Sequence, residues 1–224
     1  MPDNSKIIYV REIPVNFKRT KRKGAALAYK NEQFYLTASY FVPQFELDRF
    51  LEDKYVWMQK QLARPHKNVT IKWEEGSTVY ILGEPKTLHM ENSKRSSVEV
   101  TPEYLIVRGP SLNAMKGAYK KYVMGKMDEI IDSFRSEITY PVGDYLLSYR
   151  YYTSRWGCCN RKKRQINLNV WCYGLPLEGI RYVYCHELAH LKVGHHQKPF
   201  YDHLGEIWPD YRKGLKLTKD YIIS

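Results

Sequence analysis

Short runs of alternating apolar and polar residues dominate the first 140 positions, and two longer patterns of helical period interrupt them. The strand-like runs cover residues 6–15, 25–29, 33–39, 69–73, 78–82, 87–90, 98–100 and 104–107. Helices are expected over residues 43–62 and 111–136, where apolar side chains recur every three or four positions. Turn residues between the runs favour hairpins, including one tip at the basic residues 18–23.

The last third of the chain predicts two more strands followed by helices. The strands are expected over residues 146–154 and 165–171, and the helices around residues 184–191 and 198–208. This order predicts an α+β fold of antiparallel β-hairpins and long helices, with its functional helix near the C-terminus. We divide the chain into an N-terminal region, residues 1–140, and a catalytic region, residues 141–224, which pack as one compact unit without an internal repeat.

Charge narrows the range of partners. The 224 residues contain 36 Lys and Arg against 24 Asp and Glu, a net charge of +12. This excess favours anionic partners such as nucleotides, nucleic acid or acidic peptides. Basic residues gather at two expected hairpin tips, residues 18–23 and 161–164, which are either nucleic-acid contacts or solvated surface.

Other compositional signals exclude several protein classes. No run of eighteen apolar residues predicts a membrane span, and the first residues lack an apolar signal region, so we expect a cytoplasmic protein. The cysteines Cys158, Cys159, Cys172 and Cys185 form no Cys-x-x-Cys pair, which argues against a zinc ribbon. A nucleophilic pair of Cys185 and His186 is disfavoured, because a metal motif already accounts for this histidine.

That motif is His-Glu-x-x-His, formed by His186, Glu187 and His190. On a helix, residues four apart are neighbours, so the two imidazoles can bind one zinc ion. Glu187 can then act as general base toward a zinc-activated water. The alternative is a surface helix with two solvated histidines. Apolar positions such as Ile180 and Leu188 argue against it, because they give the helix a buried side.

A catalytic zinc usually needs a third protein ligand. Gly194 is followed by His195 and His196, and a glycine with positive φ could reverse the chain and return a histidine to the metal. We favour His196, which follows His190 by six residues, and keep His195 as the reserve ligand or as a donor to the transition state.

Several segments together resemble a known family. They are residues 154–158, 166–169, 182–191, 196–200 and 208–212. In this order they are similar to the YgjP-like metal-dependent hydrolases, a minimal zincin group related in pattern to SprT-type metallopeptidases. The resemblance implies a zincin-like active-site helix with His196 as third ligand. Relatives commonly have Asn where this chain has His195, and Ser where it has Cys158.

These observations predict a zinc-dependent hydrolase, with one zinc ion per chain and peptides or proteins as its substrates. One alternative is a metal-dependent nucleoside triphosphate pyrophosphatase. The other is a non-enzymatic nucleic-acid-binding protein with a structural metal. Arg155 is either a contact for an anionic substrate or part of a strand-end salt bridge. The sequence does not define the oligomeric state.

Overall fold

The computed structural model describes residues 5–30, 33–63 and 66–223. The chain divides into two compact units, residues 1–66 and 67–224. This division differs from the predicted boundary at residue 140. The long helix before residue 140 buries its apolar side in the same hydrophobic core as the C-terminal helices and strands, so these segments belong together.

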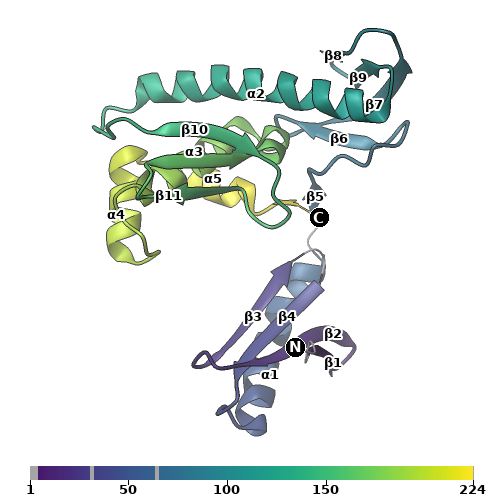
Figure 1. Ribbon diagram of the computed structural model, residues 1–224. Helices are drawn as coiled ribbons and strands as arrows, with labels where there is room; N and C mark the ends of the chain where they lie inside the picture. Colours follow the sequence, from purple (N-terminus) through teal and green to yellow (C-terminus); the bar gives the residue numbers. More distant parts are fainter. Residues whose placement is uncertain (1–4, 31–32, 64–65, 224) are drawn as a thin grey trace. The chain divides into compact units, whose positions relative to one another are not determined.

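The first unit is a four-stranded sheet covered on one face by a helix (Figure 1). Its elements are β1 (Ser5–Val10), β2 (Ile13–Thr20), β3 (Ala25–Lys30), β4 (Gln33–Ser39) and α1 (Gln44–Ala63). The strand order is β1-β2-β4-β3, in which β2 and β4 are parallel and the outer pairs antiparallel. Alternate strand residues such as Val15 and Leu36 point toward Leu47 and Met58 of α1, and together they form this unit's core.

Two sequence predictions for this unit are wrong. Residues 6–15 form two strands, because Arg11 has φ 54° and turns the chain between them. Residues 18–23 are not a hairpin tip, since β4 lies between β2 and β3. Pairing between distant strands depends on the whole sheet, and local alternation does not reveal it.

The second unit begins with the same arrangement. After β5 (Lys67–Asn68) come β6 (Thr78–Ile81), β7 (Glu84–Asn92), β8 (Ser97–Val100), β9 (Tyr104–Gly109) and the helix α2 (Leu112–Glu137). The order β6-β7-β9-β8, with β7 parallel to β9, repeats that of the first unit. Each sheet is followed by a long helix, so the chain contains a structural repeat that the sequence analysis missed.

The remaining elements form the part of the second unit that carries the histidines. They are β10 (Leu146–Arg150), β11 (Gly157–Asn160), β12 (Gln165–Asn169), a 3-10 helix (Val170–Gly174), α3 (Leu177–His190), α4 (Lys198–Ile207), α5 (Tyr211–Thr218) and β13 (Tyr221–Ile222). β12 is the central strand, parallel to β10 and antiparallel to β11. The predicted tip at residues 161–164 is therefore confirmed, but the strand that leads into it is β11, which was not predicted, and the expected strand at residues 146–154 pairs in parallel as the shorter β10.

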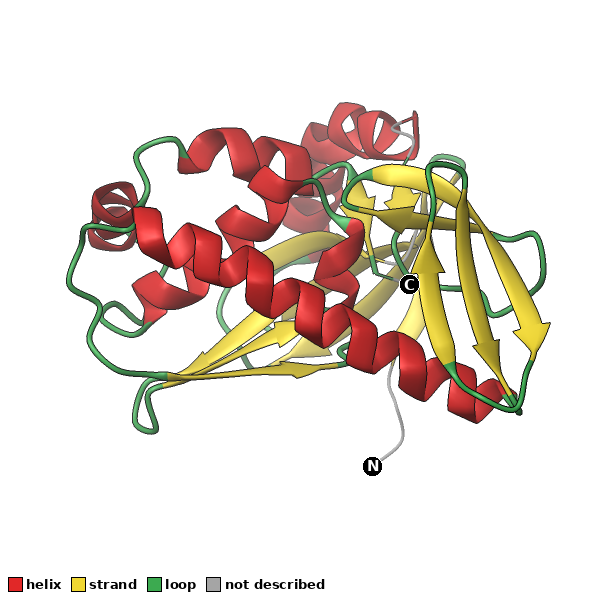
Figure 2. Cartoon of the chain, turned by 90° about the horizontal axis from the view of Figure 1, so that it is seen from above, coloured by secondary structure: helices red, strands yellow, loops and turns green. Residues whose placement is uncertain are grey.

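Helix α2 connects the two parts of this unit. Figure 1 shows it running from the β7–β9 end to β10, and Figure 2 shows its full length beside the strands. One side of α2 is buried along its whole length. The buried residues of this side are Met115, Tyr119, Val123, Met127, Ile131 and Phe134. The helix thereby fixes the β6–β9 sheet to the sheet beside α3.

The α+β fold class is confirmed. Residues 69–73, predicted as a strand, are not one, although the Val69 amide still donates to the Ile222 carbonyl. α5 and β13 were not predicted. Within the described residues, no helix combines the length and apolar character that crossing a membrane requires.

Candidate metal centre

Helix α3 presents two histidines on one side. It begins after Pro176, carries Glu178 in its first turn, and buries Ile180 and Leu188 in the core. His186 and His190 are one turn apart, and their ring centroids are separated by 4.8 Å. The amphipathic helix predicted from the sequence is therefore present, with both imidazoles side by side.

His196 lies between α3 and α4 and completes a triangle of imidazoles. Its Nε2 atom lies 3.0 Å from Nε2 of His190 and 3.0 Å from Nε2 of His186, and the last two atoms are 3.2 Å apart. Within the described part of the chain, these are the three residues whose ligand atoms converge as a potential metal site. His195 is exposed and outside this group.

The other nitrogen atoms fix how two of the rings are oriented. Nδ1 of His190 lies 3.0 Å from the carbonyl oxygen of Val193, and Nδ1 of His186 lies 3.3 Å from the hydroxyl of Tyr182. A carbonyl oxygen can only accept, so Nδ1 of His190 carries the proton and Nε2 keeps a free lone pair. Such outer hydrogen bonds are typical of histidines that bind metals.

Phe200 of α4 supports all three imidazoles. Its ring is fully buried, and its centroid lies 4.9, 4.6 and 4.9 Å from those of His186, His190 and His196. This packing restricts rotation of the rings before any ligand binds. The sequence predicted a helix around residues 198–208, which contains Phe200, but not the contact of this ring with the histidines, which depends on how α4 packs.

Burial keeps the helical histidines neutral. It lowers the pKa of His186 to about 3, with smaller contributions from His190 and His196, and it also lowers the pKa of His190. A neutral imidazole is the form that binds a metal. Near neutral pH both helical histidines are therefore in the form that binds a metal.

Glu187 is buried on the side of α3 that faces β11. A Cβ atom at Gly157 of β11 would lie 2.8 Å from Cγ of Glu187, so glycine is needed there for the carboxylate to fit. Burial raises the pKa of Glu187 to about 7, and the nearby charge of Arg155 opposes this shift. A carboxyl group with such a pKa can take up and release a proton near neutral pH.

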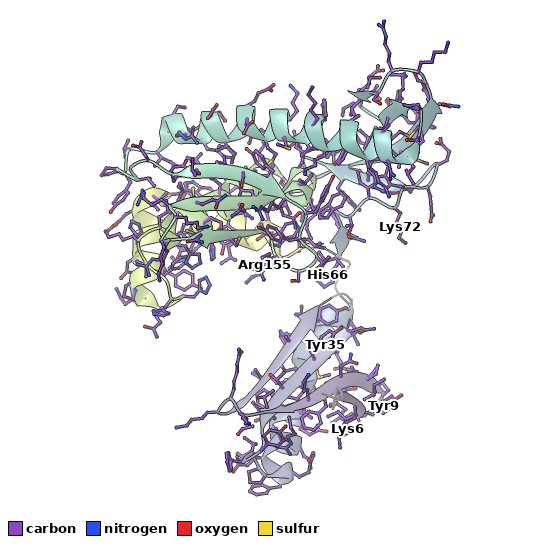
Figure 3. The ribbon with its side chains drawn as sticks, viewed as in Figure 1. Lys6, Tyr9, Tyr35, His66, Lys72 and Arg155 are labelled. Atoms are coloured by element: carbon purple, nitrogen blue, oxygen red, sulfur yellow. The ribbon has the colours of Figure 1, made fainter. Side chains whose placement is uncertain are left out.

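Arg155 lies in the exposed loop before β11 (Figure 3). Its guanidinium is 5.7 Å from the centroid of the Tyr152 ring, and no carboxylate of the described chain lies within ion-pair distance. The strand-end salt bridge considered from the sequence is therefore not formed in the described part of the chain.

The turn after α3 differs from its prediction. Gly194 does not have positive φ, and α3 ends with Leu191 in the right-handed helical region. A Cβ atom at Gly194 would instead lie 2.9 Å from Nη1 of Arg161, whose Nη2 donates to the Lys192 carbonyl. A larger residue here would have to displace the flexible end of the Arg161 side chain, and no left-handed backbone calls for glycine at this position.

The cysteines take no part in this cluster. Cys185 is fully buried, and burial raises the pKa of its thiol to about 12, so it stays protonated. The Sγ atom of Cys158 lies 3.3 Å from the hydroxyl of Tyr152 and 3.7 Å from Nδ2 of Asn167. Cys158 thus occupies a polar site within the sheet.

Comparison with models of protein families gives one match that covers most of the chain. The model of the YgjP-like family, metallopeptidase domain, matches residues 23–220. This chain belongs to the YgjP-like metallopeptidase family. No curated protein and no solved structure matched the chain. Membership of this YgjP-like family implies a metal-dependent hydrolase, and His186, His190 and His196 are residues that could hold the metal.

Proposed function

We propose that this YgjP-like protein is a zinc-dependent metallopeptidase in which His186, His190 and His196 hold one zinc ion and Glu187 is the general base. The observation that carries this proposal is the triangle of Nε2 atoms on the helix that also bears the buried Glu187. Tetrahedral zinc with Zn–N bonds of about 2.0–2.1 Å needs ligand nitrogens about 3.3–3.4 Å apart. The separations of 3.0, 3.0 and 3.2 Å are close to that requirement.

When bound, zinc supplies a Lewis acid and lowers the pKa of a coordinated water to about 7. The protein's own residues provide the remaining functions. Val193 and Tyr182 orient two imidazoles through Nδ1, and Phe200 limits their rotation. Glu187 takes a proton from the attacking water and delivers it to the leaving amine, for which a pKa of about 7 is suitable.

The outer edge of β11 is the best-suited binding site for an extended peptide. β11 is the terminal strand of its sheet and lies beside α3, with Gly157 against Glu187. The Asn169 amide donates to the Trp156 carbonyl, so these two opposite residues form a hydrogen-bonded pair. Hydrogen-bonded and non-hydrogen-bonded pairs alternate along an antiparallel ladder. The N–H and C=O groups of Gly157 and Cys159 therefore point away from β12. A peptide that adds to this edge would lie next to the histidines.

A proline at position 159 tests this edge. Cys159→Pro removes an outward N–H, and proline is tolerated on edge strands, so we expect the KM for a peptide substrate to rise. The rise should be about 2–10-fold, which corresponds to one hydrogen bond. Cys159→Ala is the matched control for loss of the thiol and should leave KM unchanged. An equal KM in the proline variant, at full metal content, would exclude this edge as the peptide site.

The proposed function is tested with a panel of substrates. Untagged protein is incubated separately with casein, nucleoside triphosphates and labelled DNA, each with and without a chelator. We expect cleavage of casein that stops on chelation and returns when zinc is added. Chelator-sensitive release of pyrophosphate, without peptide cleavage, would replace the peptidase by a nucleotide hydrolase.

A further inference from the structure

One face of the sheet in the first unit is covered by no described element of that unit. α1 covers the side formed by residues such as Val15 and Leu36. The opposite side, which we call the outer face, is formed by alternate residues of all four strands. Its side chains include Ile7 and Tyr9 of β1, Asn16 and Lys18 of β2, and Tyr35 and Thr37 of β4. Figure 3 labels Tyr9 and Tyr35 on this sheet.

Aromatic rings on the outer face are accessible and flanked by small or polar residues. Tyr9 is 70% exposed and Tyr35 is 37% exposed. Tyr35 lies opposite Ala28 of the neighbouring strand β3, and this short side chain leaves one side of the Tyr35 ring uncovered. On its other side Nδ2 of Asn16 donates to Gln33, and the hydroxyl of Tyr35 donates to the same side-chain oxygen. The face therefore combines planar rings with amide groups at fixed positions.

Positive charge lies at the end of this face. The turn after β2 exposes Lys21, Arg22 and Lys23. Among the described residues of the four strands and their turns, Glu12 is the one carboxylate, and it accepts a hydrogen bond from Tyr55 of α1. The guanidinium of Arg19 differs from these exposed cations, because its Nη1 donates to the carbonyls of Ser39 and Val42 and so stabilises the loop between β4 and α1.

The structural repeat provides a comparison within the same molecule. The equivalent face of the β6–β9 sheet bears Arg108, which forms ion pairs with Glu91 at 2.6 Å and Glu99 at 2.9 Å. Its exposed tyrosine, Tyr104, packs against the His89 ring with centroids 4.6 Å apart. In the second unit the charge of this face is therefore neutralised by ion pairs, whereas no ion pair among the described residues involves Lys21, Arg22 or Lys23 of the first unit.

We infer that the outer face and the turn at residues 21–23 bind single-stranded nucleic acid. Unpaired bases can stack on Tyr9 and Tyr35, while Lys21, Arg22 and Lys23 contact the phosphates. In a duplex the bases are stacked on one another, so their faces are not available to these rings.

An anionic lipid surface is the rival partner. Tyr40 and Phe41 are exposed. They lie next to the turn at residues 21–23, because the Tyr40 amide donates to the carbonyl of Thr20, which precedes this turn. Rings beside cations also suit membranes. However, the Asn16 and Gln33 side chains lie beside Tyr35, and among the described residues no hydrogen bond occupies Oδ1 of Asn16 or Nε2 of Gln33. Hydrocarbon would leave these two atoms without a partner, whereas bases offer them donors and acceptors.

The test is fluorescence anisotropy of labelled oligo(dT) and oligo(U) with the 224-residue chain at several salt concentrations. Replacing Tyr9 and Tyr35 by Leu should weaken binding about tenfold per ring, and replacing both by Phe should preserve affinity because the rings remain. Lys21→Glu with Arg22→Glu should weaken binding and lower the slope of log K against log salt by about 1.4.

Two controls come from the second unit. Lys162→Glu with Lys163→Glu makes the same charge change in another exposed turn, and Tyr104→Leu removes the ring of the equivalent face. Both should bind like the parent. Equal losses in these controls would overturn the inference, and so would parental affinity in the double Leu variant. Binding to phosphatidylserine vesicles but not to either oligonucleotide would also overturn it, in favour of a lipid surface.

Discussion

Glu187→Gln is expected to lower the turnover of the peptide substrate by about 10²–10⁴-fold, the range for loss of a general acid–base group. Glutamine has nearly the same size and can form hydrogen bonds, so it fits against Gly157 without a steric change. It cannot take a proton from water. Metal content and the melting temperature should therefore remain close to those of the parent.

Glu178→Gln is the matched control for this variant. Glu178 lies on the same helix but at its first turn, where it pairs with Lys213 at 3.3 Å. Its replacement should leave turnover unchanged. If Glu187→Gln bound the metal and turned over substrate at nearly the parental rate, Glu187 would not be the base.

His196→Ala is expected to weaken zinc binding by more than about 100-fold. Loss of a residue that only supports a ligand typically costs 10–100-fold, and His196 is proposed as a ligand itself. His195→Ala is the matched control, because His195 is adjacent and exposed but outside the triangle of Nε2 atoms. It should retain parental affinity.

The measurement is a titration of both variants against a chromogenic chelator of known zinc affinity. Phe200 and the backbone of α4 should remain in place, so circular dichroism should detect no unfolding. A larger loss in His195→Ala than in His196→Ala would transfer the ligand role to His195 and contradict the geometry.

The local part of the site could be predicted from the sequence. The i, i+4 spacing of His186 and His190 fixes their proximity once a helix forms, and apolar residues such as Leu188 indicated that helix. The interval to His196 indicated the histidine that the structure brings to the other two. The role of Gly194 was predicted wrongly, because its close contact is with Arg161, which is distant in sequence.

Features that depend on distant pairing could not be predicted. The contact of Phe200 with three imidazoles requires the packing angle of α4, and the insertion of β4 between β2 and β3 requires the complete sheet. The structural repeat was missed because its two copies share strand order but differ in the residues on their outer faces, as Tyr35 and Arg108 illustrate.

Zinc K-edge X-ray absorption of the untagged protein, combined with elemental analysis, tests the metal centre most directly. We predict about one zinc per chain, bound to three imidazole nitrogens at about 2.0–2.1 Å and one further light atom. Less than about a tenth of an equivalent, without uptake of added zinc, would contradict the proposed centre. Sulfur scattering at about 2.3 Å would also contradict it, because it would assign the metal to cysteines rather than to His186, His190 and His196.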